Sequence, residues 1–371
     1  AECELLLRSC AQVAVTVGEL VLLIGGRRMR PGPRSGVVVV NCRTLQVSAA
    51  VLASDSEDPP PRFRHAACKI APAVPGGLER VLVLGGVSLS STANRVYRSS
   101  EALVLELLDD DGSTVRWRTR RLEGDAPAEG APLFHHVLCS FERGWRVLAW
   151  GGDTMDFDYD STADFNRARR ECAERSAYAF VLDVRTWQWR RQPLGGPEPG
   201  HRSLAEGVVY DDQLVILGGT SDPKPLRPFE FGELASMNPH VLDLRSWTWL
   251  PGPRDSGRDI PEPRTRFAVE RRGKWLLGYG GRDAVGQMLG DVFLLDLGAR
   301  TWCKPAVLGH GHVLGAAACC STMCGGAVLG GLSFNVIIPK ADALLFVAPP
   351  VKAVEPSLEE ELAEGLWRGQ K

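Results

Sequence analysis

The stretch Leu214-Val215-Ile216-Leu217-Gly218-Gly219 shows the pattern that decides the fold of this chain. A short apolar run stopped by a pair of glycines is typical of a buried strand, because a buried helix would need a longer run. The same pattern occurs six times, with Gly pairs at 25–26, 85–86, 151–152, 218–219, 280–281 and 330–331. Repetition along nearly the whole chain predicts a repeat architecture.

A second unit follows most of the Gly pairs. It is an apolar strand, a tight turn opened by an acidic residue, and another strand entered by Trp. In the fourth repeat Asp243 opens the turn and Trp247 enters the strand; the unit recurs at 180–187 and 293–302, and a looser version lies at 103–117. Large indole side chains suit the space between packed sheets, so we expect Trp247 to be buried between two sheets.

Each repeat also has a strand before its Gly pair, for example at 65–70 and 267–271, so that four short antiparallel strands make one unit. A single four-stranded sheet leaves both of its faces open to water, whereas sheets packed around a common axis cover one another. The sequence therefore predicts an all-β fold, a six-bladed β-propeller with four antiparallel strands per blade.

The six Gly-Gly motifs, with the Asp–turn–Trp unit in four repeats, resemble kelch repeats. The resemblance covers roughly residues 2–348 and implies a kelch-type β-propeller with one repeat per blade. It also implies closure by strands from both chain ends, so that an N-terminal strand closes the last blade. Segment Cys3–Leu7 is the candidate strand, because Pro349 and Pro350 are unsuited to a central strand.

We therefore expect two parts, the six-bladed kelch propeller over residues 1–348 and a C-terminal tail over residues 349–371. The stretch 357–365 in the tail predicts a short capped helix. Between Lys304 and Lys340 the chain carries no charged residue. Glycines split this apolar stretch, and the repeats place two strands in it, so we expect no membrane span.

Composition limits the classes of function. Lys and Arg number 43 against 45 Asp and Glu, so the net charge of −2 argues against a nucleic-acid binder. Only seven of the cations are Lys, which reflects either coding bias or arginines that bind carboxylates or phosphates. Ten scattered Cys and the lack of an Asn-x-Ser/Thr acceptor favour a cytoplasmic or nuclear location.

A recurring motif in the loops before four of the repeats supplies the candidate binding residues. Aligned on its proline, the fourth position is Arg64, His135, Arg202 or Arg266. We expect these side chains, with His65 and Ser203, at the mouth of the central channel, on the face that carries the long loops. Converging guanidinium groups favour an acidic peptide or a chain-terminal carboxylate. The alternative is that each of these residues ties neighbouring loops together.

The sequence carries no complete catalytic or metal-binding pattern. The sequence has no nucleophile elbow, phosphate loop or dinucleotide fingerprint. The Asp run at 156–160 lacks the Gly and the distal Glu of a calcium loop. His310, His312, Cys319, Cys320 and Cys324 lack the spacing of a zinc site. We therefore expect no catalytic residues, no metal and no cofactor.

The kelch resemblance implies a non-enzymatic module that binds a protein or peptide, such as the substrate-recognition part of a ubiquitin ligase. The basic rim favours an acidic partner, and we expect neither nucleic acid nor membrane as a partner. The alternative is an enzyme or an enzyme-attached propeller, similar to kelch-like oxidases, epimerases, or accessory domains of methyltransferases and phosphatases. A scaffolding role such as actin binding stays open as well.

Overall fold

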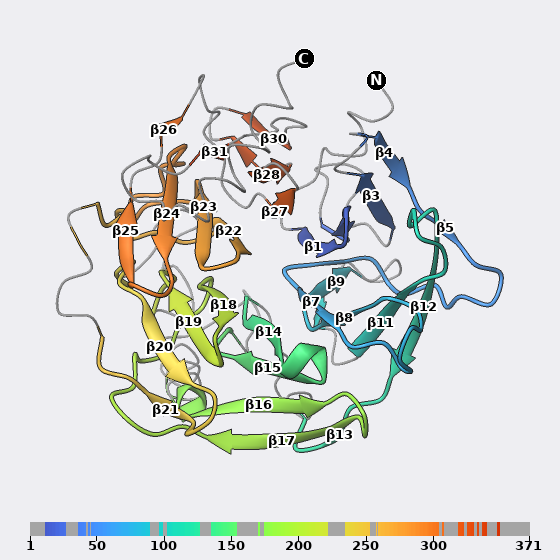
Figure 1. The fold of residues 1–371 in the computed structure, drawn as a ribbon, viewed down its shortest axis with the longest axis horizontal. Helices are drawn as coiled ribbons and strands as arrows, with labels where there is room; N and C mark the ends of the chain where they lie inside the picture. The colour runs from blue at the N-terminus through green and yellow to red at the C-terminus, as the bar shows by residue number, and fades with distance from the viewer. Residues whose placement is uncertain are drawn as a thin grey trace.

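The first strand of each repeat lies nearest the centre of the molecule, and the other three follow outward (Figure 1). In this computed structural model, five antiparallel sheets of this kind stand around a central axis, and each sheet is one blade. The structure describes residues 12–26, 36–41, 44, 46–89, 96–98, 102–126, 135–153, 170, 174–221, 234–252, 257, 259–303, 306–307, 318–322, 325–329, 332–333, 336–339 and 347–348. The predicted β-propeller is therefore confirmed as the fold.

The five blades follow one another along the chain. From inner to outer strand, blade one is β1 (Val13–Val17), β2 (Leu20–Ile24), β3 (Val37–Asn41) and β4 (Gln46–Ala49); blade two is β7 (Ala66–Ile70), β8 (Arg80–Leu84), β11 (Ala102–Leu107) and β12 (Thr114–Arg120); blade three is β14 (Val137–Phe141), β15 (Arg146–Trp150), β16 (Tyr178–Asp183) and β17 (Gln188–Pro193). Blade four is β18 (Glu206–Tyr210), β19 (Gln213–Leu217), β20 (His240–Asp243) and β21 (Thr248–Trp249); blade five is β22 (Ala268–Arg272), β23 (Trp275–Tyr279), β24 (Val292–Asp296) and β25 (Thr301–Cys303).

The core lies between neighbouring blades. β2 and β8, which end at Gly pairs, are buried along their whole length. β8 lies between blades one and three, which cover its two faces. The cluster between blades one and two contains Leu22, Val83 and Trp117, and similar clusters fill the next three interfaces. The unbroken apolar runs of the sequence thus match strands that are covered on both sides.

Four tryptophans take equivalent places on the outer strands. Trp117, Trp189, Trp249 and Trp302 pair across the sheet with Leu105, Leu182, Leu242 and Leu295. Trp302 therefore matches Trp249, whereas Trp247 is the last residue of the turn, with φ 57°, and is half-buried. The predicted burial between blades belongs to Trp249, two residues later, because the strand turns its alternate side chains to the interface.

The sixth repeat does not form a four-stranded sheet in the described part of the chain. It gives three pairs, β26 (Ala306–Val307) with β31 (Val347–Ala348), β27 (Ala318–Thr322) with β28 (Gly325–Leu329), and β29 (Leu332–Ser333) with β30 (Val336–Pro339). β27 contacts both β22 and β1, so this pair stands between blades five and one (Figure 1). Five blades are shown, and the predicted sixth is not.

The sixth repeat is described only in part. β27 runs from Ala318 to Thr322, and the residues directly before it lie outside the described part of the chain. β31 pairs with β26. The stretch consists of small apolar residues with glycines, which give no periodic signal for a strand boundary. The N-terminal strand at 3–7 and the tail helix at 357–365 lie outside the described residues.

The linkers between blades pair with outer strands, which the sequence does not predict. Three linkers in the described part of the chain each lay a short parallel segment along the outer strand of the blade that they enter, and we call such a segment a strap. β5 (Val51–Leu52) pairs with β12, and β13 (Glu123–Gly124) pairs with β17. Gly195 forms a parallel bridge to Thr248 of β21.

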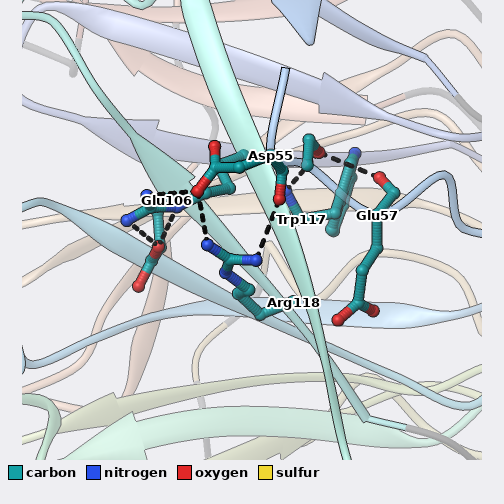
Figure 2. Close-up of polar contacts among 7 residues, drawn as sticks. Asp55, Glu57, Glu106, Trp117 and Arg118 are labelled. Atoms are coloured by element: carbon teal, nitrogen blue, oxygen red, sulfur yellow. Dashed lines mark hydrogen bonds and ion pairs between the residues drawn. The ribbon is translucent and has the colours of Figure 1, made fainter. Parts of the chain in front are cut away.

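The linker residues just after β5 also bond to β12, through their side chains. Arg118 donates to Asp55 at 2.6 Å (Figure 2). The backbone N–H of Trp117 donates to the Ser56 hydroxyl at 2.9 Å. The backbone N–H of Thr119 donates to Glu57 at 2.6 Å. The linker from Val51 to Glu57 therefore bonds to β12 through both backbone and side-chain groups.

Two smaller elements complete the described chain. β6 (Arg62–Phe63), β9 (Val87–Leu89) and β10 (Val96–Arg98) form a three-stranded sheet, and a 3-10 turn, Glu142–Gly144, joins β14 to β15. No helix in the described part of the chain is long and apolar enough to cross a membrane.

Candidate functional site

The Gly pairs bring the chain of the next blade close to the end of each second strand. A side chain on Gly151, whose φ is 68°, would meet the carbonyl oxygen of Arg202 at 2.5 Å. The N–H of the second glycine, Gly152, donates to this same carbonyl at 2.8 Å. Arg62 and Arg264 receive the same bond from the second glycine of blades one and four, so Arg62, Arg202 and Arg264 are equivalent residues.

These three residues, which we call the clamp arginines, tie neighbouring blades together. Each guanidinium donates to the carbonyl of the first glycine in its own blade; Arg202 reaches Gly218 at 3.0 Å and Arg264 reaches Gly280 at 2.9 Å. All three are buried. Burial lowers the pKa of Arg202 to about 10. The ring-tying role considered for the basic positions therefore applies to Arg202.

Two residues after each clamp position stands a second set of equivalent residues, Arg64, His135, Leu204 and Arg266, which we call the mouth ring. Each has a left-handed backbone, with φ of 59°, 55°, 56° and 55° in that order. Backbone bonds join successive members: His135 N–H donates to the Arg64 carbonyl at 3.3 Å, and Leu204 N–H to the His135 carbonyl at 3.1 Å. The proline alignment is therefore wrong for blade four, where Leu204 takes the place assigned to Arg202.

The inner strands enclose a central cavity of about 500 Å³. All four mouth-ring residues line it, and since each directly precedes an inner strand, they lie at one end of the channel. Of the six predicted site residues, the cavity brings together Arg64, His65, His135 and Arg266. Arg202 and Ser203 lie behind it, and most of the long loops expected around the mouth are outside the described residues.

His135 shares a buried carboxylate with Ser203. Nδ1 of His135 lies 3.1 Å from Oδ2 of Asp153, and the Ser203 hydroxyl donates to the same oxygen at 2.8 Å. Burial and the positive charges of Arg64 and Arg266 hold the pKa of His135 well below 6.5. These effects favour the neutral form of His135.

His65 occupies a different position from His135. It is the residue after the mouth-ring position, it is buried, and its ring packs on Gly25 of the preceding blade. Burial and the charge of Arg62 lower the pKa of His65 to about 3. His136, its equivalent in blade three, behaves in the same way, with a pKa of about 3. Both are neutral packing groups near the channel.

Glu206 adds a carboxyl group to the cavity wall. It is the first residue of β18 and lines the cavity two residues after Leu204. Removal from water raises the pKa of Glu206 to about 8. The side chain is therefore mostly protonated at neutral pH and adds little negative charge to the channel.

We expect Glu206→Gln to change the pH dependence of stability in a defined direction. The pKa of Glu206 rises from 4.5 to about 8 on folding, so the folded state keeps a proton that the unfolded chain loses. The contribution of Glu206 to stability therefore falls as pH rises from about 4.5 to 8, and the melting temperature of wild type minus that of the variant should fall over this range. Thermal melts across this range check it, with the surface variant Glu142→Gln as control. A difference between wild type and Glu206→Gln that does not change with pH would contradict the assignment.

Sequence reasoning missed two residues of this region, Asp153 and Glu206. Asp153 carries a usable signal, because it directly follows a Gly pair and is the only acidic residue at that position in the six repeats. Glu206 is the charged first residue of an otherwise uncharged inner strand. Within the described residues, no group of three or more His, Cys, Asp or Glu could hold a metal ion.

Comparison with known proteins agrees with this architecture. The chain is 27% identical to host cell factor of Drosophila melanogaster over 274 residues, which are 70% of this chain and 15% of that protein. It is 25% identical to human host cell factor 1 over 271 residues, 68% of this chain and 11% of that protein. The chain thus spans only a small part of the length of these relatives.

A solved structure and a family model match as well. The structure titled "Structure of YjhT" superimposes with a TM-score of 0.62 at 13% identity, covering 92% of this chain and 97% of that one, and shows a shared fold. The model of the KLHDC2/KLHL20/DRC7 Kelch-repeats domain matches residues 73–330, well over half of the sequence. The chain belongs to the kelch-repeat family.

Proposed function

We propose that this chain is a non-enzymatic protein-interaction module whose channel mouth binds an acidic segment of a partner protein. The observation that carries the proposal is the convergence of Arg64 of blade two and Arg266 of blade five on His135, whose pKa their positive charges lower. Two guanidinium groups at one end of a concave cavity favour an anionic ligand. Neutral Glu206 does little to oppose it.

The different positions of the two sets of arginines support the proposed binding site. The clamp arginines donate to backbone carbonyls inside the ring, whereas Arg64 and Arg266 line the cavity. We propose that the clamp arginines serve ring stability and that Arg64 and Arg266 serve ligand binding. Arg202 and Ser203 do not line the cavity, and His65 lines it as a neutral packing group, so we do not count these three among the groups that bind the ligand.

We also propose how the propeller is completed, where the protein is located and in what kind of assembly it acts. We propose that β27 and β28 belong to a sixth blade, because β27 contacts both neighbours that such a blade would have. The buried Cys68 and Cys139 are unpaired, which is usual for a cytoplasmic or nuclear protein. The kelch resemblance supports a place in a larger assembly, such as substrate recognition for a ubiquitin ligase, with neither nucleic acid nor membrane as partner.

Neutralising the mouth should weaken binding without unfolding the protein. We expect Arg64→Gln and Arg266→Gln each to weaken binding of an acidic hexaglutamate probe about tenfold, the effect of losing a hydrogen bond to a charged group. Binding by wild type should also weaken as salt rises. Fluorescence anisotropy at two salt concentrations measures both effects. Arg185→Gln, which removes an exposed Arg from the turn after β16, is the matched control.

The competing role predicts the opposite result. If Arg64 and Arg266 only tie the ring together, both variants should melt at lower temperature and bind hexaglutamate like wild type. That outcome would refute the proposed binding site. Failure of wild type to bind the probe at any salt concentration would refute it as well.

A further inference from the structure

Asp153 holds an unusual position among the six repeats. The residue after the Gly pair is Arg27, Val87, Asp153, Thr220, Arg282 or Leu332, so blade three alone has a carboxylate there. Asp153 is only 5% exposed. It joins the loops of two blades, because His135 precedes β14 of blade three and Ser203 precedes β18 of blade four, and both contact its Oδ2.

The contact with Asp153 decides which nitrogen of His135 carries the proton. A neutral imidazole has one N–H and one acceptor nitrogen. Nδ1 faces a carboxylate oxygen at 3.1 Å, which accepts hydrogen bonds and donates none, so the proton belongs on Nδ1. Nε2 is then the acceptor and is the nitrogen that takes up the second proton.

We infer that Asp153 is the positioning residue of the channel mouth: it fixes the His135 tautomer and couples anion binding to protonation of His135. The ligand part of this inference rests on the proposed function. An anion held by Arg64 and Arg266 offsets the positive charge that keeps His135 neutral. His135 then binds a proton at Nε2, and Asp153 holds the resulting cation as an ion pair. The neutral ring thus becomes a third positive group when the ligand arrives.

Several charged or titratable groups in the described part of the chain act on His135. Arg64 and Arg266 act on it from blades two and five, His136 lies beside it, and Asp153 contacts it directly. Glu206, on the neighbouring inner strand, lines the same cavity and titrates near pH 8. Protonation of Glu206 would also favour an anion at lower pH, so its contribution must be removed before that of His135 is measured.

The tautomer is tested on the full chain without ligand. Nitrogen-15 NMR of the His rings should show His135 with its proton on Nδ1, and Asp153→Asn should shift this signal toward the other tautomer. Ser203→Ala removes the other partner of the same carboxylate oxygen and should leave the tautomer unchanged. A wild-type His135 that carries its proton on Nε2 would overturn the inference.

The coupling is tested by binding. In a Glu206→Gln background, affinity for hexaglutamate should rise as pH falls from 7.5 to 5.5, by at most tenfold per pH unit, since one proton is taken up per ligand. The rise should disappear in Asp153→Asn and in His135→Gln but persist in Ser203→Ala. Melting curves check that each variant is folded. If Asp153→Asn does not fold, His135→Gln alone tests the coupling.

The outcomes separate the inference from the proposed function. If hexaglutamate binds wild type with no pH dependence, or if the dependence survives in Asp153→Asn or His135→Gln, the coupling is wrong and the binding site stands. If hexaglutamate does not bind at any pH, the proposed function and the coupling both fail. The NMR result on the free protein then still decides whether Asp153 sets the tautomer.

Discussion

Replacing Trp249 with alanine is expected to lower the free energy of unfolding by about 3–5 kcal/mol, the usual cost of removing a large aromatic side chain from a core. Trp249 is 1% exposed and lies in the cluster between blades three and four. Its ring meets that of Trp150 edge to face, with centroids 5.2 Å apart. Alanine would leave a cavity that β-strands held on both sides cannot collapse to fill. Denaturant unfolding followed by circular dichroism measures the loss.

Trp247→Ala is the matched control, two residues earlier on the same chain segment. Trp247 is half-buried and contacts the edge of Phe141 with ring centroids 6.0 Å apart. We expect a loss of about 1 kcal/mol, the size of an aromatic pair contact. A larger loss for Trp247→Ala than for Trp249→Ala would mean that the outer strand presents its other face to the interface.

Arg264→Met is expected to destabilise the protein by about 3 kcal/mol, because it leaves buried backbone acceptors without donors. Arg264 is 1% exposed. It donates to the Gly280 carbonyl at 2.9 Å and forms two bonds to Asp291, at 2.6 and 2.9 Å. The guanidinium also lies 5.0 Å from the centre of the Phe293 ring. Methionine replaces part of the volume and none of the donors.

Asp291→Asn separates the effect of the ion pair with Arg264 from that of the bond between Arg264 and the Gly280 carbonyl. The Asp291 side chain is 49% exposed, so it returns to water easily, and an amide oxygen can still accept one bond from Arg264. We expect a loss of about 1 kcal/mol or less, in line with exposed ion pairs. Equal losses for Asp291→Asn and Arg264→Met would show that the ion pair, and not the bond to the Gly pair of its own blade, gives Arg264 its importance.

The repeat pattern was enough to predict the architecture because both of its signals have direct physical causes. A Gly pair such as Gly218-Gly219 is needed where the next blade passes too close for a side chain, and the contacts at Gly151 and Gly218 show this closeness. The unbroken apolar runs follow from blades that cover both faces of a strand such as β8. Neither signal depends on details of the loops.

Register was harder to predict than architecture. Two Trp residues stand at alternate positions in the units of blades three and four, and only the packing direction of the outer strand distinguishes them. The clamp and mouth positions likewise lie two residues apart, and loops of unequal length bring the proline to a different distance from the inner strand. Arg202 and Leu204 could therefore be told apart only once the bonds to Gly152 and His135 were known.

The candidate site was likewise only partly predictable from the sequence. Arg64, His135 and Arg266 were predicted together, and the cavity brings them together. The partner of His135 lies in another loop, after a Gly pair, and no local pattern connects Asp153 with a residue 18 positions earlier. The low pKa of His135 depends on charges from two other blades, which a single sequence does not place in space.

The straps have a consequence for synthesis on the ribosome. Each strap precedes in the chain the blade whose outer edge it covers: Val51–Leu52 comes before blade two, and Glu123–Gly124 before blade three. An exposed outer strand is a template for pairing with another chain. Because the cover leaves the ribosome first, the outer edge of each of these blades is closed as soon as its last strand forms. A partly synthesised propeller thus avoids edge-to-edge aggregation while the later blades are still being made.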